Sequence, residues 1–581
     1  MFVLDLRRCA GLGACIGLLA AIGGAQARVD GWTIQRVSVS DTGAISNGTN
    51  DGVVVSGDGR FVGFSSTGSN LVPNDTNGVR DGFLVDWRAH HIERVTVGSA
   101  DQQTNGSASI GKPSFDGRFV PFGSKASNLD PADPDSIIDG YIRDRHTHTT
   151  ILVSPRFVSG VQKKEAFLQD MSADGRFAVL ATYSEDLIPG DTNGYPDIYV
   201  FDTQTRTYQI ASTNELGEIG NSYSSKPSIS PDGRYVGFYT GASNLVPLFG
   251  HSTSSKPVLK DMFGGKLAAV HVQTTGAPAY TGAGGTLAIS TDGRFVAYET
   301  NGIEFGHESG PHAGFTSAYV RDMHRPLAEN AGLTVPGGRA NHDMRYLTMS
   351  ADTRFVAMSS PATNVTPVDG SDSDVFLRDR VLETTMVLNL GDQGQLPNEG
   401  VAPYPKISDD GLVGAFESNA NNLIKNSPAG GWQIYVVSRD FSEPGHYCHT
   451  VPTPTDCTLR IDSTSLDGPE RPSGPALCIR DAPAASRALL FYSINGPAML
   501  PYGASGWLCI RAPFAKLGLL PSGTSAACGG EFAFDFADWI DSGADPQLVP
   551  GEIVYLQAWV SDPSHTAHGT LTDALAFRLL P

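Results

Sequence analysis

Cysteine is absent from most of this 581-residue sequence. No cysteine lies between Cys15 and Cys448, so this long segment cannot contain a disulfide. The cysteines after residue 445 are Cys448, Cys457, Cys478, Cys509 and Cys528. The abrupt change predicts a domain boundary near residue 445, and the cluster is consistent with disulfides in an oxidising compartment. Because five is an odd number, at least one of these thiols has no partner within this segment.

Basic residues are also scarce. The sequence has 41 Lys and Arg against 61 Asp and Glu, a formal net charge of -20 at pH 7. An acidic surface argues against nucleic acid and anionic lipid headgroups as partners, because both are polyanions. It is compatible with divalent cations.

Long apolar runs are missing after the N-terminus, so we expect no membrane span. Residues 9–24 are apolar or small, follow Arg7 and Arg8, and precede a small-x-small site at Ala25–Ala27. This pattern predicts a signal peptide over residues 1–27 and a secreted or periplasmic protein. A lipoprotein box at Leu12–Cys15 is the alternative, but the apolar run continues beyond Cys15.

Catalytic motifs are absent as well. The sequence has no G-x-S-x-G nucleophile elbow and no H-E-x-x-H zinc motif. His307 and His312 flank a Gly-rich loop, which favours a solvated loop over a zinc site. The motifs of these hydrolase classes therefore give no candidate catalytic residue.

What the sequence does contain is a repeat. An Asp, usually followed by Gly-Arg, recurs at intervals of 58 or 60 residues, a period that indicates a repeat architecture. The repeated positions are Asp58, Asp116, Asp174, Asp232, Asp292, Asp352 and Asp410. Alternating apolar runs bounded by turn residues predict four short antiparallel strands in each unit.

Seven such units predict an all-β fold, a seven-bladed β-propeller over residues 28–444. The segment Thr33–Asp41 looks like the last strand of a unit with no unit before it, whereas the seventh unit lacks that strand. We therefore expect the N-terminal strand to complete the last blade and close the ring, which removes two exposed edges.

The recurring pattern S-x-D-G-R-F-V-x-F, followed by D-x-F-V-R-D, resembles the TolB-like, WD-repeat-like propeller family of exported bacterial proteins. The resemblance covers roughly Val29 to Pro444 and implies the propeller fold. Its relatives have many functions, so it does not imply one activity.

Each repeat also predicts an ion pair inside its blade. The Arg after the Asp-Gly turn begins a strand beside the end of the strand that carries a second recurring Asp. The expected pairs include Arg60 with Asp86 and Arg176 with Asp202, and a bidentate structural role is favoured over a binding role.

The opposite face should carry the longer loops, where function is more often found. Two of these loops contain the pattern D-x-N-G-x-x-D, which resembles the start of a calcium-binding loop. The candidate metal ligands are Asp75, Asn77, Asp81, Asp191, Asn193 and Asp197. Related acidic residues are Asp133, Asp135, Asp139, Asp369, Asp372 and Asp374. The alternative to Ca²⁺ is an Asx turn, in which Asp and Asn bond their own backbone.

Residues 445–581 form a second predicted domain, a small β-sandwich with alternating apolar and polar residues. Tyr447-Cys448, Cys528–Phe532 and Gln557–Leu575 resemble a C-terminal module of exported bacterial proteins. This resemblance suggests the pairs Cys448–Cys457 and Cys509–Cys528, leaving Cys478 alone.

Two functions remain open from the sequence. The first is an exported, non-catalytic binding or scaffold protein, expected to be monomeric, that presents its loop face to a protein, glycan or cell-surface ligand. The second is a hydrolase or lyase acting on an extracellular polymer with carboxylates of the loop face.

Overall fold

The computed structural model contains two compact units, one over Ala27–Ser438 and one that includes Arg439–Pro581. In the first, it describes residues 32–154, 165–246, 255–272, 285–300, 315–325, 327–334, 338–368, 370, 373–401, 404–425 and 431–438. In the second, it describes residues 439, 445–446, 460–464, 476–482, 487–493, 497–501, 507–510, 515–521, 530–536, 545, 548, 553–561, 569–571 and 575–578.

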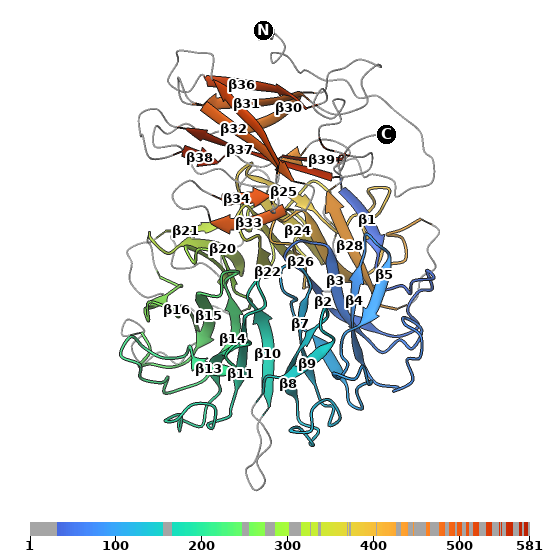
Figure 1. The fold of residues 1–581 in the computed structure, drawn as a ribbon, viewed down its shortest axis with the longest axis vertical. Helices are drawn as coiled ribbons and strands as arrows, with labels where there is room; N and C mark the ends of the chain where they lie inside the picture. The colour runs from blue at the N-terminus through green and yellow to red at the C-terminus, as the bar shows by residue number, and fades with distance from the viewer. Residues whose placement is uncertain are drawn as a thin grey trace. The chain divides into compact units, whose positions relative to one another are not determined.

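The first unit is a propeller of seven four-stranded antiparallel sheets, as predicted (Figure 1). Blades 1 to 3 consist of β2 (Asn50–Val55), β3 (Phe61–Ser66), β4 (Asp81–Asp86) and β5 (His91–Arg94); β6 (Ala108–Ile110), β7 (Phe119–Ser124), β8 (Asp139–Asp144) and β9 (Thr149–Leu152); and β10 (Ala166–Met171), β11 (Phe177–Thr182), β12 (Asp197–Asp202) and β13 (Thr207–Ile210).

Blades 4 to 6 consist of β14 (Ser224–Ile229), β15 (Tyr235–Thr240), β16 (Lys256–Asp261) and β17 (Leu267–Ala269); β18 (Ala288–Ile289), β19 (Phe295–Thr300), β20 (Ser317–Asp322) and β21 (Leu327–Asn330); and β22 (Arg345–Met349), β23 (Phe355–Ser360), β24 (Asp374–Asp379) and β25 (Thr384–Val387). Blade 7 consists of β26 (Lys406–Ile407), β27 (Val413–Ser418), β28 (Gln433–Arg439) and the N-terminal β1 (Trp32–Arg36).

The N-terminal strand closes the ring. This was predicted from the extra strand before the first unit and the missing last strand of the seventh. Strand β1 lies beside β28 in the seventh sheet. The Val37 amide then donates to the Ile434 carbonyl at 2.9 Å, and the Ser38 hydroxyl donates to Gln433 at 2.6 Å. Apolar side chains of blades 7 and 1, including Val436 and Phe64, form one buried cluster across the closure.

The Ser-x-Asp-Gly turn explains the most regular part of the repeat. In blade 3, the Ser172 hydroxyl donates to Asp174 Oδ1, and the same oxygen accepts from the Arg176 amide at 2.9 Å. Ser172 Oγ in turn accepts from the Phe177 amide at 2.9 Å. The Ser and Asp side chains therefore satisfy the backbone of the turn, and the Ser–Asp bond recurs in the other six blades.

Glycine is required at the next position because the turn needs a positive φ. Gly175 has φ 72°, and a Cβ there would collide with the Phe119 ring of the preceding blade. Blade 6 departs from this rule, because Thr353 adopts φ 69°. A β-branched residue in this region of φ/ψ space is strained.

We therefore predict that Thr353→Gly raises the free energy of unfolding by about 1 kcal/mol. The relieved strain is about 1–3 kcal/mol, and the greater chain entropy of Gly in the unfolded state offsets about 0.5–1 kcal/mol of it. Chemical denaturation measures this difference, and Gly175→Ala is the opposite control that should destabilise. A destabilised Thr353→Gly variant would contradict the assignment of strain.

The predicted ion pair is present in each of the first six blades. The side-chain N–O distances lie between 2.7 and 3.0 Å, with Arg60–Asp86, Arg118–Asp144, Arg176–Asp202, Arg234–Asp261, Arg294–Asp322 and Arg354–Asp379 as the pairs. Each guanidinium also lies over the aromatic ring of the next residue. The recurring arginines thus hold the first and second long strands of a blade together.

Pairs of asparagines connect two loops on the opposite face. In blade 2, the backbone amide of Asn105 donates to Asn128 Oδ1 at 3.1 Å, and Asn128 Nδ2 donates back to the Gln103 carbonyl at 2.8 Å. The same Asn–Asn hydrogen bond recurs in blades 1, 4, 6 and 7, where each blade is counted with the loop before its first strand. The second Asn of the pair begins the recurring sequence Asn-Leu-x-Pro in blades 1, 2 and 4, and these hydrogen bonds explain its recurrence.

The elements whose bounds the structure describes in the C-terminal unit are β-strands, which agrees with the predicted all-β class. Its largest sheet has six strands: β29 (Gly445–His446), β32 (Arg487–Ser493), β35 (Ala515–Pro521), β37 (Ile553–Ser561), β38 (Gly569–Leu571) and β39 (Leu575–Arg578). The smaller sheets are β30 (Arg460–Thr464), β31 (Ala476–Ala482) and β36 (Gly530–Asp535), and β33 (Pro497–Pro501) with β34 (Trp507–Ile510). Tyr492 of the six-stranded sheet packs edge-on against Phe536, which follows β36.

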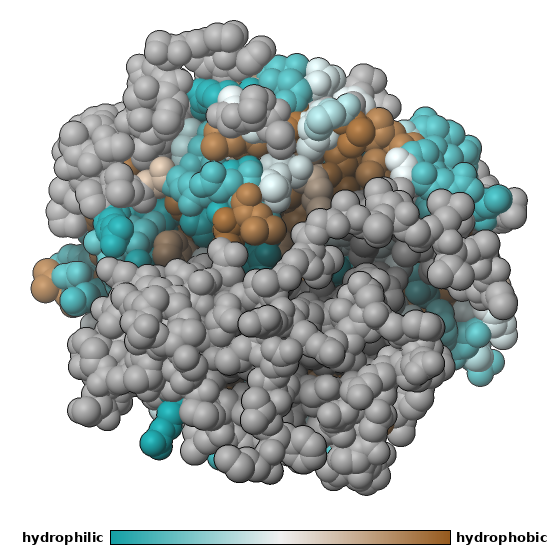
Figure 2. Space-filling model, turned by 90° about the horizontal axis from the view of Figure 1, so that it is seen from above, coloured by the Kyte–Doolittle hydropathy of each residue, from teal (hydrophilic) through white to brown (hydrophobic). Residues whose placement is uncertain are grey.

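Apolar and polar residues are interspersed where described residues reach the surface in Figure 2. The most exposed large apolar side chains, Leu216, Phe263 and Leu382, come from different parts of the propeller. Apolar residues exposed singly are ordinary in folded proteins. Within the described ranges, no helix is long and apolar enough to cross a membrane.

Candidate functional site

The innermost strands of the seven blades surround a central cavity of about 750 Å³. One position of the repeat faces this cavity in every blade: the residue four places before the Asp of the Asp-Gly turn. These residues are Val54, Lys112, Asp170, Ser228, Ala288, Thr348 and Lys406. The repeat therefore places seven side chains in a ring, and their chemistry differs from blade to blade.

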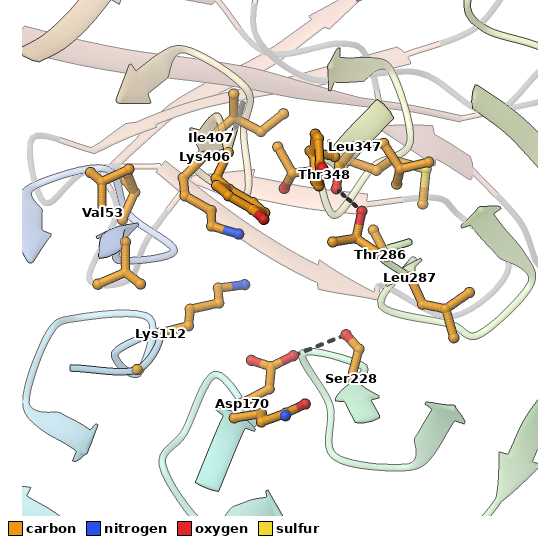
Figure 3. Close-up of a pocket in the computed structure, with 18 of the residues that line it drawn as sticks. Val53, Lys112, Asp170, Ser228, Thr286, Leu287, Leu347, Thr348, Lys406 and Ile407 are labelled. Carbon is orange, nitrogen blue, oxygen red and sulfur yellow. Dashed lines mark hydrogen bonds between the residues drawn. The ribbon is translucent and has the colours of Figure 1, made fainter. Parts of the chain in front are cut away.

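Two lysines of this ring extend into the cavity (Figure 3). The Nζ atom of Lys112 lies 3.3 Å from Asp409 Oδ1. Lys406 has no hydrogen bond or ion pair to any residue that the structure describes. A third lysine, Lys226, also lines the cavity and is exposed.

The electrostatic surroundings of the two lysines differ. The pKa of Lys406 is lowered, mainly by desolvation and also by the positive charge of Lys112. The negative charges of Asp170 and Glu417 oppose this shift but do not cancel it. Desolvation acts on Lys112 in the same direction, but the attraction of Asp409 and Asp170 outweighs it and raises the pKa of Lys112. Lys112 thus has an ion-pair partner, whereas the described residues offer Lys406 only the attraction of carboxylates beyond ion-pair distance.

Carboxylates in or next to the cavity accept hydrogen bonds from the backbone of neighbouring blades. Asp170 Oδ2 accepts from the Ser228 hydroxyl at 2.9 Å and from the Ile229 amide at 3.2 Å in the next blade. Glu299 accepts from the Tyr346 amide at 2.8 Å, and Glu417 accepts from the Val53 amide at 3.0 Å. Burial raises the pKa of Glu299 and of Glu417, and their backbone hydrogen bonds oppose this shift.

β-Bulges also line the cavity. Register shifts occur in β2, β14 and β22, and each bulge contains a residue with positive φ: Gly52 (67°), Lys226 (52°) and Tyr346 (57°). Bulges and left-handed non-glycine residues concentrate at functional sites, where they redirect side chains. The Tyr346 ring packs against Tyr404 with a centroid distance of 4.4 Å, which gives this wall of the cavity an aromatic surface.

The carboxylates of the first predicted metal loop are paired with a cation from strand β5. Arg94 Nη1 lies 3.0 Å from Asp75 Oδ1 and 3.5 Å from Asp81 Oδ2. Asn77 turns its amide nitrogen toward Asp81 Oδ2 at 2.8 Å, and Thr96 and Thr104 donate to Asp81 Oδ1. Asp75 and Asp81 are thus brought together by an arginine that lies in the place of a metal ion.

At the second predicted loop, no arginine among the described residues pairs with the carboxylates. Asn193 Nδ2 donates to Asp197 Oδ2 at 2.7 Å, Ser212 donates to Asp197 Oδ1 at 2.6 Å, and the Tyr199 hydroxyl donates to Asp191 Oδ2. Asp191 Oδ1 has no hydrogen-bond partner among the described residues. Burial, together with the charge of Asp191, raises the pKa of Asp197 to about 6.

The related loop of blade 2 brings three carboxylates together. Asp133, Asp135 and Asp139 each have an oxygen within 4.8 Å of the others. In blade 6, Asp374 accepts from the Asn389 amide at 2.8 Å. Asp369, Asp372, His307, His312, Cys448, Cys457, Cys528 and the predicted signal peptide lie outside the described residues.

Sequence reasoning placed the site on the loop face and did not single out Lys112 or Lys406. A signal for them exists in the repeat itself. Aligned on the turn Asp, the seven segments place two lysines, an aspartate and two hydroxyl residues at one position that faces the channel. The position is half-buried in six of the seven blades, and charges gathered there around one channel indicate a binding cavity.

Comparison with known proteins yields the fold alone. No family model matches the chain, and no curated protein matches it. Among solved structures, an oligogalacturonate lyase from Vibrio parahaemolyticus is 13% identical, with a TM-score of 0.42, covering 70% of this chain and 93% of that one. TolB from Acinetobacter baumannii is 14% identical, with a TM-score of 0.31, covering 68% and 81%. The chain is thus distantly similar in structure to propellers of different functions.

Proposed function

We propose that this protein is an exported, non-catalytic binding protein whose central propeller cavity takes a small anionic ligand. The observation that supports the proposal most directly is Lys406, a cationic side chain in the cavity that has no hydrogen bond or ion pair to any described residue and feels Asp170 and Glu417 only from beyond ion-pair distance. A charged group removed from water is costly unless a partner satisfies it. A carboxylate or phosphate of a ligand is such a partner.

Other features of the cavity suit the same ligand class. Lys112 and Lys226 add positive charge, and the Tyr346–Tyr404 pair offers an apolar surface beside it. Ligand cavities typically combine apolar walls with a few convergent polar groups, and volumes of about 300–1,000 Å³ are usual. The proposed ligand is therefore compact and carries one or two acidic groups.

Isothermal titration with inorganic phosphate and with citrate tests the proposal, with glucose as a neutral probe. We expect binding of at least one anion and no heat from glucose. Lys406→Met should lose this binding, whereas the matched control Lys125→Met should retain it, because Lys125 is an exposed loop residue outside the cavity. Equal affinity of Lys406→Met and the parent protein would refute the site.

The alternative is a hydrolase or lyase that acts on an extracellular polymer through carboxylates of the loop face. We favour the binding role because these carboxylates already accept hydrogen bonds within their blades. Asp81 accepts from Thr96 and Thr104, and Asp197 accepts from Asn193 and Ser212. A general acid or base must instead reach the substrate.

A further inference from the structure

Four lysines of the propeller differ in what surrounds their side-chain nitrogen. Lys112, Lys226 and Lys406 line the central cavity, whereas Lys260 is buried in strand β16 and is not among the residues that line it. A lysine attacks a carbonyl group only as the neutral amine, which burial and a neighbouring positive charge favour. Its nitrogen must also be reachable by a ligand and not already bonded to protein acceptors. Only a side chain that meets both conditions is a nucleophile.

Lys260 shows that desolvation alone is not sufficient. Burial lowers the pKa of Lys260, but its Nζ donates to four acceptors at 3.0–3.2 Å. The acceptors are the backbone carbonyls of Thr213, Asn214 and Gly265 and the hydroxyl of Thr213. Lys260 thus connects a loop after blade 3 with a turn of blade 4, and its nitrogen is not open to a ligand.

Lys112 and Lys226 fail the conditions in two other ways. The Nζ of Lys112 lies 3.3 Å from Asp409 Oδ1. Desolvation lowers the pKa of Lys112, but the attraction of Asp409 and Asp170 outweighs this effect and raises it, so Lys112 stays protonated. An ammonium group has three N–H donors, so Lys112 can hold an acid group of a ligand as well as Asp409. Lys226 is exposed, and water solvates its charge.

Lys406 meets both conditions. It is half-buried, lines the cavity and has no hydrogen bond or ion pair to any residue that the structure describes. Figure 3 shows its side-chain nitrogen and that of Lys112 pointing toward one another from two blades. Desolvation and the charge of Lys112 lower the pKa of Lys406, and the opposing carboxylates, Asp170 and Glu417, do not cancel this shift. More of Lys406 than of an ordinary lysine is therefore neutral amine at neutral pH.

We propose that Lys406 captures the keto group of a 2-oxo acid as a reversible imine, while the Lys112 ammonium holds the acid group of the same molecule. The proposal rests on the proposed anion-binding cavity and narrows its ligand class. A 2-oxo acid carries its keto carbon directly beside the carboxylate, so one small molecule can meet both of the lysine nitrogens that point toward each other. Phosphate and citrate have no keto group and bind the protonated form of Lys406 instead.

The capture needs no co-reactant, because it is a condensation that releases water. The lone pair of the neutral Lys406 Nζ forms a bond to the keto carbon, and the π electrons of the C=O bond move to oxygen. One amine proton moves to that oxygen and gives a carbinolamine. The nitrogen lone pair then forms the C=N bond, and the hydroxyl group leaves with the second amine proton as water. The protonated Lys112 stabilises the negative charge that develops on the oxygen.

Reductive trapping tests the capture. The protein is incubated with pyruvate and sodium cyanoborohydride, which reduces the C=N bond of an imine, and the modified lysine is identified by mass spectrometry of its peptides. Each trapped chain should gain the mass of pyruvic acid minus one oxygen atom, and the modification should map first to Lys406. Lactate, in which a hydroxyl group replaces the keto group, should give no adduct. Excess citrate should slow the trapping, because it occupies the same cavity.

Lys406→Arg separates the nucleophile from the cation. Arginine keeps the positive charge, but its guanidinium is always protonated and forms no imine. We therefore expect Lys406→Arg to trap pyruvate severalfold more slowly than the parent, at the rate of the exposed lysines, while isothermal titration still detects phosphate or citrate. The matched control Lys125→Met changes an exposed lysine outside the cavity and should trap pyruvate at the parent rate.

Two outcomes would overturn the proposal. One is a parent protein in which pyruvate is trapped on Lys112, or on exposed lysines such as Lys125, as fast as on Lys406. The other is Lys406→Arg that traps pyruvate at the parent rate. If the parent still binds phosphate or citrate in these cases, the anion-binding cavity stands and only the nucleophile is wrong. A parent that binds neither anion but traps pyruvate at Lys406 would instead refute the anion site and support the nucleophile.

Discussion

Lys406→Met should stabilise the protein and weaken anion binding at the same time. Removal of a desolvated cation that has no ion-pair partner should raise the free energy of unfolding by about 1 kcal/mol, within the range of stabilising substitutions at functional sites. The loss of a charged hydrogen bond, typically about 1.5–3 kcal/mol, should weaken anion binding by about tenfold to a hundredfold. Chemical denaturation and isothermal titration measure the two effects.

The stability gain should also depend on pH. Because the pKa of Lys406 is lowered in the folded protein, its charge is a penalty at neutral pH, and this penalty disappears as the pH rises through the ordinary lysine value of 10.5. The difference between Lys406→Met and the parent should therefore be largest at neutral pH. Anion binding by the parent should weaken at a lower pH than an ordinary lysine would allow.

Lys112→Met is the matched comparison from the same ring, with the opposite sign. Its removal leaves Asp409 and Asp170 without their shared cation, so we expect a loss of about 1–3 kcal/mol of stability, the usual cost of an uncompensated buried polar group. If both lysine variants shift stability in the same direction, the contrast between a compensated and an uncompensated lysine is wrong.

Much of the propeller could be predicted because its local signals agree with one another. The residues of the Ser-x-Asp-Gly sequence are enough to predict the turn. Ser172 and Asp174 form the hydrogen bonds of the turn, and Gly175 adopts the positive φ that it needs. The seven turns then give the number of blades, and the orphan strand at Trp32–Arg36 gives the closure. The Arg–Asp pairs followed from strand direction alone.

The candidate site was harder to predict because it depends on contacts between blades. The backbone amide of Tyr346, in a bulge of blade 6, donates to Glu299 of the preceding blade. No pattern within a single repeat predicts that hydrogen bond. Arg94 likewise lies in the outermost strand, beyond the strand that follows the loop whose carboxylates it contacts. A motif read along the chain finds the acidic loop but cannot show which other strand provides its counter-charge.

Arg354→Ala should be the most damaging of the six ion-pair substitutions. In blade 6 the pair is buried, with side-chain exposures of 8% for Arg354 and 10% for Asp379, whereas Arg176 in blade 3 is 40% exposed. Breaking a buried pair by removing one partner typically costs about 3–5 kcal/mol, because the other charge remains buried. A partly exposed pair is worth about 1 kcal/mol or less, because solvent screens it.

Arg354→Ala and Arg176→Ala therefore compare the same ion pair at two degrees of burial within one protein. Denaturant unfolding of Arg354→Ala and Arg176→Ala should give losses that differ by severalfold, with anion binding unchanged in whatever fraction remains folded, since neither arginine lines the cavity. The double variant Arg354→Met/Asp379→Leu separates the two contributions: replacing both charges with apolar groups should recover most of the loss. Equal losses in blades 3 and 6 would show that burial does not set the strength of these pairs, and that the arginine's stacking on Phe355 or Phe177 dominates instead.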